Sequence, residues 1–176
     1  MISIMINWLR SLPHQQSTYE QGRHLFRRDD PVQNMFLIES GAVQLIRAHR
    51  GGGALVLQRA SAGSILAEAS LFTTSYHCDA ITTELVRATL IARRALRKLF
   101  LSNPEFAQAW AIHLSGEVRN ARRRAEILSL RTVAERLDAW IAEHGRLPDK
   151  GGWRGVALEI GASPEALYRE IARRRK

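Results

Sequence analysis

The sequence predicts an α+β protein in three parts: an N-terminal β-barrel or jelly roll, one long helix, and a small helical region at the C-terminal end. Three observations predict this arrangement. Short apolar runs broken by turn residues fill residues 23–94, which suits an all-β domain. Residues 104–129 place apolar side chains three and four apart, as on one face of an amphipathic helix. Two shorter helical patterns then meet at Gly161.

The first expected element is a short helix over the N-terminal stretch MISIMINWLRSLP. This stretch has no basic start before its apolar residues and no small-residue cleavage site, so it is not typical of an export signal. No apolar run approaches the roughly 20 residues that a membrane span needs. Cys78 is the single cysteine, which excludes an intrachain disulfide. We therefore expect a cytoplasmic protein with no membrane association.

Strands are expected next, in runs such as NMFLIES, GAVQLIRAHR, ALVLQRA and LVRATLIARR. Residues 42–47 alternate between two faces, which is the period of a β-strand. The glycine run at residues 51–53 predicts a hairpin turn, because glycine adopts positive φ angles without steric cost.

The pattern becomes helical at Ala95, with a short helix to about Leu101 and a long helix that carries Pro104 in its first turn. The narrow apolar seam of the long helix suits either a core helix or a two-stranded coiled coil, and periodicity alone weighs these equally. Its position between strands and a helix-turn-helix pattern favours a homodimer. The expected dimer interface comprises Trp110, Leu114, Val118, Ala121, Ala125 and Leu128.

Residues 132–144 predict a further helix, which Gly145 ends. Residues 147–152 predict a loop or a tight hairpin, and residues 153–175 two helices joined at Gly161. Ser163 is expected to cap the second of these helices and Pro164 to begin it.

Charge and composition restrict the function. The net charge of +9 predicts an anionic partner, most commonly nucleic acid, although solubility alone would also account for it. Basic residues cluster at 122–124 and 173–176. No Ser-His-Asp set, paired carboxylates, phosphate loop or metal-ligand spacing occurs, so we expect no catalytic residues, no enzyme activity and no metal site.

Three segments resemble, in the same order, those of the CRP/FNR family of transcription factors. The stretch GRHLFRRDDPVQNMFLIESGAVQL is similar to the entrance of that family's sensor barrel, and AGSILAEASLF to its phosphate-binding cassette. Residues 156–167 fit its helix-turn-helix. The resemblance implies a sensor domain at 1–101, a dimerisation helix at 102–130 and a helix-turn-helix domain at 131–176. It further implies a homodimeric transcription regulator that binds double-stranded DNA, with RNA polymerase as another partner.

The helix-turn-helix supplies the expected contacts with DNA. Glu165, Arg169 and Arg173 recur every four residues on one face of the last helix. Glutamate accepts from the amine of cytosine and arginine binds guanine, each pair giving about 1–3 kcal/mol of discrimination. With Ser163, they are the expected DNA-binding residues, although a salt-bridged solvated face would show the same spacing.

The resemblance also implies a β-hairpin wing after the recognition helix, and the sequence ends at Lys176 without one. We therefore expect a truncated helix-turn-helix domain that binds DNA weakly and with strong salt dependence, because each phosphate contact adds close to one unit of log–log slope.

The cassette has lost ligand contacts that the resemblance implies. Glu68 is retained beside Ala67, but Cys78 takes the position of the arginine that binds the cyclic phosphate, and Asp79 is its neighbour. A thiol does not neutralise a phosphate, and Asp79 repels it. We expect no useful affinity for cyclic AMP or cyclic GMP, which micromolar binding by calorimetry would refute. The degenerate effector pocket comprises Ala67, Glu68, Cys78, Asp79, Ala121 and Arg122.

Two other functions remain open. One is a ligand-sensing or protein-interaction module that has lost specific DNA binding. The other is a haem-based gas or redox sensor in which Cys78 and His77 supply the iron ligand or the oxidisable thiol. A small structural cysteine in a strand is the simpler interpretation of Cys78, and no other cofactor is expected.

Overall fold

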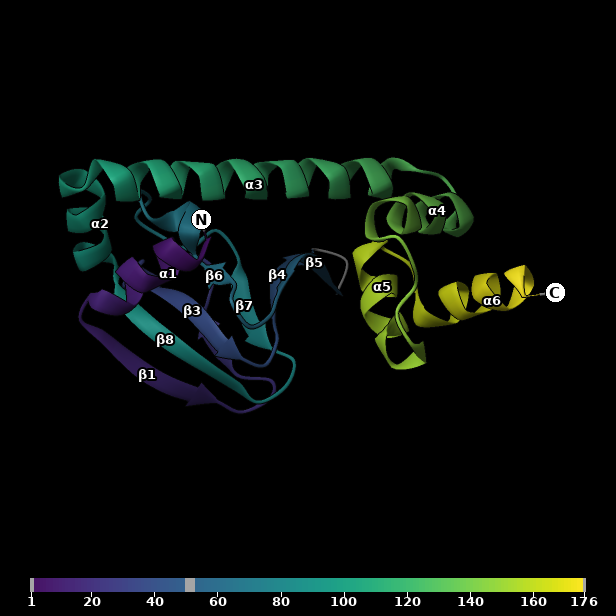
Figure 1. The fold of residues 1–176 in the computed structure, drawn as a ribbon. Helices are drawn as coiled ribbons and strands as arrows, with labels where there is room; N and C mark the ends of the chain where they lie inside the picture. The colour runs from purple at the N-terminus through teal and green to yellow at the C-terminus, as the bar shows by residue number, and fades with distance from the viewer. Residues whose placement is uncertain (1, 50–52, 176) are drawn as a thin grey trace. The chain divides into compact units, whose positions relative to one another are not determined.

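The computed structural model describes residues 2–49 and 53–175 and divides into two compact units, residues 1–114 and 115–176. Figure 1 shows strands with helices in the first unit and helices in the second, so the predicted α+β class is confirmed. Among the described residues no helix combines the length and the apolar character that crossing a membrane requires.

The first unit begins with α1 (Ile2–Ser11) and forms two four-stranded antiparallel sheets from its described residues. One sheet has the order β1-β8-β3-β6: His14–Tyr19, Val86–Ala92, Asn34–Ser40 and Ile65–Leu66. The other has the order β2-β7-β4-β5: His24–Phe26, Asp79–Thr82, Val43–His49 and Gly53–Ala60. The fold is jelly-roll-like, but the described strands do not close into one barrel. The strands β2 and β6, each at one edge of its sheet, have only three and two residues.

Two details of the strand region differ from the sequence-based expectation. The strands begin earlier, because β1 pairs along its whole length with β8, from His14 with Ile91 to Tyr19 with Val86. Its sequence HQQSTY has no apolar alternation, which is typical of an exposed edge strand. The predicted glycine turn lies partly outside the described residues: β5 begins at Gly53, but Gly51 and Gly52 are among those not described.

Helices complete the core of the first unit. The buried residues of the two sheets form one cluster with buried residues of three helices. The helical members are Met5 and Leu9 of α1, Leu96 of α2 (Arg93–Ser102), and Phe106 and Trp110 of α3 (Pro104–Ser129). A short 3-10 helix, η1 (Glu68–Ser70), follows β6. The predicted range of the long helix is confirmed, whereas α2 begins two residues before the expected Ala95.

The second unit contains the rest of α3 followed by α4 (Val133–His144), η2 (Lys150–Gly152), α5 (Trp153–Glu159) and α6 (Pro164–Arg174). The expected end of α4 at His144 is confirmed, and the helix begins one residue after the expected Thr132, which caps it. Thr132 and Glu135 form a reciprocal capping box, and Gly145 follows the helix with φ +80°. The buried core draws on α3, α4, α5 and α6, through Ile127, Leu137, Trp140, Trp153, Val156, Ala157, Ile160, Leu167 and Ile171.

Candidate nucleic-acid interface and effector pocket

A tight turn joins α5 to α6. Gly161 has φ +62°, a conformation that side chains with a Cβ rarely adopt. A Cβ at this position would lie 2.5 Å from Leu128 Cδ2. The Ala162 amide donates to the Ala157 carbonyl oxygen over 2.8 Å. The turn between the predicted two helices thus requires glycine for both its backbone angle and its close contact.

The start of α6 is capped as the sequence predicted. Ser163 Oγ accepts a hydrogen bond from the Ala166 amide over 3.2 Å, and Pro164 occupies the first helical position. The capping role of Ser163 is therefore confirmed. A contact between Ser163 and DNA stays a prediction, and the hydroxyl already accepts one bond within the protein.

One face of α6 is buried and another is open to solvent. Leu167 is completely buried and Ile171 is 4% exposed. Both side chains pack α6 against the core of the second unit. Glu165 and Arg169 are exposed, one helical turn apart. Hydrogen bonds from its own backbone amide and from Ser163, followed by the charges of Arg154 and Arg169, lower the pKa of Glu165. It is therefore an ionised acceptor at neutral pH.

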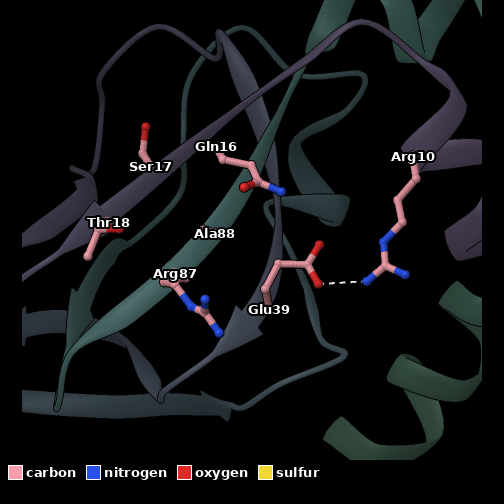
Figure 2. A pocket seen from close by; sticks show the side chains of 7 residues that line it. All are labelled: Arg10, Gln16, Ser17, Thr18, Glu39, Arg87 and Ala88. Atoms are coloured by element: carbon pink, nitrogen blue, oxygen red, sulfur yellow. Dashed lines mark hydrogen bonds and ion pairs between the residues drawn. The ribbon is translucent and has the colours of Figure 1, made fainter.

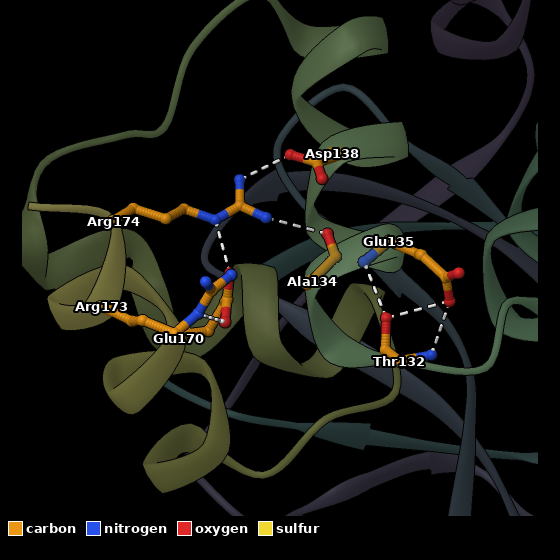
Figure 3. A network of polar contacts seen from close by, with 7 residues as sticks. All are labelled: Thr132, Ala134, Glu135, Asp138, Glu170, Arg173 and Arg174. Carbon is orange, nitrogen blue, oxygen red and sulfur yellow. Dashed lines mark hydrogen bonds and ion pairs between the residues drawn. The ribbon is translucent and has the colours of Figure 1, made fainter.

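The C-terminal end of α6 carries a network of ion pairs, drawn in Figure 3. Arg173 donates to both carboxylate oxygens of Glu170 over 2.9 and 2.8 Å. Arg174 donates to Glu170, to Asp138 over 2.6 Å and to the Ala134 carbonyl oxygen over 3.0 Å. Hydrogen bonds from the two arginines lower the pKa of Glu170 to about 2. Arg174 therefore links α6 to α4, whereas Arg173 is paired with Glu170 within α6.

Arg136 of α4 holds the turn in place through hydrogen bonds to backbone carbonyl groups, a role that was not expected from the sequence. Its Nε donates to the Leu130 carbonyl oxygen over 2.9 Å, and its Nη1 donates to the Ile160 and Gly161 carbonyl oxygens over 3.3 and 3.1 Å. One guanidinium thus joins the end of α3, α4 and the α5–α6 turn. No sequence pattern identifies it, because its partners in the turn are backbone groups 24 and 25 residues away.

The predicted dimer seam divides into a buried part and an exposed part. Trp110 is 1% exposed within the core of the first unit, and Leu114 packs against the same cluster. This corrects the expectation for Trp110, because a side chain enclosed by its own domain is not available to a partner helix. Val118 and Leu128 are 49% and 38% exposed, and Ala121 and Ala125 are exposed between them. The apolar stripe that solvent reaches therefore begins after Leu114.

The cassette segment is tightly enclosed. Ala67 precedes η1 with φ +67° and is 3% exposed, Glu68 is 8% exposed, and Cys78 is completely buried just before β7. Asp79 accepts a hydrogen bond from the Arg28 amide over 2.7 Å. The other two predicted pocket residues, Ala121 and Arg122, are exposed on the part of α3 that belongs to the second unit.

Comparison with known protein families identifies the family to which this fold belongs. Residues 16–103, half of the chain, match the family model for the cyclic nucleotide-binding domain. The chain belongs to the cyclic nucleotide-binding domain family. The match runs from β1 to the end of α2, so it covers both sheets and the cassette segment.

The chain is similar to proteins named as a global nitrogen regulator and a cyclic AMP receptor protein. The global nitrogen regulator of Synechococcus elongatus is 24% identical over 165 residues, which cover 91% of this chain and 73% of the relative. The cyclic AMP receptor protein of Thermus thermophilus is 27% identical over 124 residues, or 70% of this chain and 57% of the relative. The solved structure of FixK2 from Bradyrhizobium japonicum covers 92% of this chain and 84% of its own, with a TM-score of 0.77 and 19% identity. The predicted resemblance to CRP/FNR transcription regulators is confirmed.

The chemistry of this cyclic nucleotide-binding domain is altered at its cassette. Burial raises the pKa of the Cys78 thiol to about 11, against the opposing charge of Arg47. The thiol is therefore protonated at neutral pH, whereas an oxidation switch requires an accessible thiolate. Burial, followed by the charge of Arg47, lowers the pKa of the neighbouring His77. Across the part of the chain that the structure describes, no three His, Cys, Asp or Glu side chains gather where they could hold a metal ion.

Proposed function

We propose that the chain is a homodimeric, sequence-specific DNA-binding transcription regulator that does not respond to cyclic AMP. One observation carries the proposal: α6 begins at a capped turn, is seated through Leu167 and Ile171, and leaves Glu165 and Arg169 on its solvent side. A short helix with that exposed pair near its N-terminus suits the major groove, where arginine binds guanine and glutamate accepts from cytosine. RNA polymerase is the further partner that this function implies.

The exposed stripe on α3 supports the dimer. Val118 and Leu128 are large apolar side chains in contact with water, at spacings from Ala121 and Ala125 that keep all four on one face. The two alanines permit close approach of a second helix. Burying this stripe in a paired helix would remove apolar surface from water, at about 25 cal/mol for each Å².

The cassette supports the loss of the cyclic AMP response. Cys78 supplies no charge to a phosphate, because its thiol is neutral. Glu68 is enclosed at 8% exposure, and Asp79 adds a second carboxylate to the segment. A cyclic phosphate placed here would face these two carboxylates, and Arg47, whose charge acts on Cys78, already donates to the His77 carbonyl oxygen over 3.0 Å.

A module that has lost specific DNA binding is the second candidate, and the ion pairs of Glu170 with Arg173 and Arg174 favour it. These contacts use two basic residues that the DNA-binding function would otherwise employ. Arg169 decides between the candidates, since it is exposed and only the first candidate gives it a role.

Replacing Arg169 by alanine is expected to weaken binding to the preferred DNA sequence by about ten- to a hundredfold, which is the worth of one arginine–guanine contact. Binding to unrelated DNA should change little, and the melting temperature should be unchanged because the side chain lies in solvent. Fluorescence anisotropy with labelled duplexes measures both affinities. The matched control is Arg131→Ala, which removes an exposed arginine just before α4. Equal affinity of the Arg169 variant and the parent protein for the preferred sequence would support the second candidate.

A further inference from the structure

The first unit has a strongly basic groove that the proposed function does not use. It has a volume of about 760 Å³ and is lined by Arg93, Arg94, Arg97 and Lys98 of α2, with Val32 and Leu101 among its apolar walls. No aspartate or glutamate lines it. We call these four cations and their apolar walls the α2 groove. Its volume falls within the range of sites that hold small molecules.

The cations of the α2 groove lack acidic partners. Among the described residues, no ion pair involves Arg94, Arg97 or Lys98. Arg93 Nε donates to the Leu71 carbonyl oxygen over 2.9 Å, and the Arg97 guanidinium lies 5.6 Å from the centre of the exposed Phe72 ring. The groove therefore concentrates positive charge that no carboxylate of its own neutralises.

A second pocket of the first unit shows the contrast. It has a volume of about 350 Å³ and lies beside β1 and β8, where Figure 2 shows Arg10 directed at Glu39. Arg10 donates to Glu39 over 2.6 Å, and Arg87 donates to Ser40 over 3.1 Å. Burial acts to raise the pKa of Glu39, but hydrogen bonds from Arg10 and Thr89 outweigh it and lower the pKa. In this pocket, unlike the α2 groove, an arginine is paired with a carboxylate.

The position of the four cations is unfavourable for the helix that carries them. Arg93 and Arg94 lie in the first turn of α2, which has no acidic residue and no side-chain cap. Positive charge at a helix N-terminus opposes the macrodipole. Arg93 with Arg97, and Arg94 with Lys98, are like-charge pairs four residues apart, which destabilise a helix. Local rules are commonly broken in this way where a binding function compensates.

We infer that the α2 groove binds a small phosphorylated ligand that carries at least two negative charges. Several cations converging on one groove suit a diphosphate, because arginine forms paired hydrogen bonds to phosphate oxygens. The ligand relieves the repulsion among the four cations and contacts the exposed Leu101, which is 74% accessible. This inference does not depend on DNA binding, since all of the groove residues belong to the first unit.

Calorimetric titration of the full chain at physiological ionic strength tests the inference, with ADP and inorganic pyrophosphate as charged probes and adenosine as the uncharged one. Both charged probes should bind saturably, one per chain, and adenosine should not. The double variant Arg94→Gln/Lys98→Gln should bind ADP at least about tenfold more weakly, because it loses two charge-assisted contacts. It retains the Arg93 bond to Leu71.

The matched control is Arg27→Gln/Arg59→Gln, which removes the same charge from exposed positions of the same unit. Its ADP affinity should stay within about twofold of the parent, because neither residue lines the groove and salt weakens the effect of exposed charges. The inference is overturned if the parent protein shows no saturable binding of the charged probes, or if the groove variant binds ADP as tightly as the parent. It is also overturned if the control variant loses as much ADP affinity as the groove variant. Affinity of the groove variant for DNA should be unchanged, and a loss there as large as the loss for ADP would assign the groove to nucleic acid instead.

Discussion

Replacing Gly161 by alanine is expected to loosen the helix-turn-helix selectively. The left-handed backbone at φ +62° costs an alanine about 1–2 kcal/mol, and the new Cβ, 2.5 Å from Leu128 Cδ2, also forces that side chain to move. Hydrogen exchange should therefore be faster in residues 153–174 and unchanged in the strands of the first unit. Specific DNA binding should weaken in the same variant, because α6 is no longer held in one fixed position on the core of the second unit.

Two other glycines of the second unit separate the causes of this effect. Gly145 has φ +80° but no atom within 4 Å of its ideal Cβ, so Gly145→Ala reports backbone strain alone. Gly151 has open space and no positive φ, so Gly151→Ala serves as the neutral control. The expected order of destabilisation is Gly161, then Gly145, then Gly151. A Gly161 variant as stable as the Gly151 variant would contradict the geometry described for the turn.

Replacing Arg136 by alanine is expected to destabilise the second unit by about 2–3 kcal/mol, because three hydrogen bonds from one charged group are lost. The Leu130, Ile160 and Gly161 carbonyl oxygens all depend on that guanidinium. Lysine should rescue the loss only in part, since one ammonium cannot reproduce the planar arrangement of donors. Hydrogen exchange resolved by peptide measures the loss in α4, α5 and α6 separately from the first unit.

The control for this prediction is Arg146→Ala, which removes an exposed arginine just after α4. It should leave the exchange rates of the second unit unchanged, as surface substitutions away from such contacts usually do. Equal exchange rates in the Arg136 variant and the Arg146 variant would show that the junction of α3, α4 and the turn is held by packing alone.

Local signals explain why the helical part of the fold was predictable. Pro104, the capping box of Thr132 and Glu135, and Gly145 mark helix ends through interactions within one or two turns. Ser163 marks the start of α6 in the same way. The strands of the sheets were predictable as a class, but β1 is polar and gains its structure from pairing with β8, which no local pattern encodes.

Other features depend on distant contacts and could not be predicted. Spacings of three and four residues mark an apolar face, but they do not say what covers it. Trp110 and Val118 therefore looked alike in the sequence, although the first lies in the core and the second in solvent. Arg136 and Arg174 looked like surface charges because their partners lie far along the chain. The burial of Cys78, which makes its thiol inert, likewise depends on the packing of the whole first unit.

The proposed regulator binds DNA through two copies of α6, one from each protomer of a homodimer. Selection of bound sequences from a random duplex pool by the full chain, at two salt concentrations, tests it most directly. We expect an enriched site with two half-sites related by two-fold symmetry and centred about 10 base pairs apart, and occupancy that falls steeply as salt rises. Recovery of sequences with no enrichment, or of a single unpaired half-site, would contradict it.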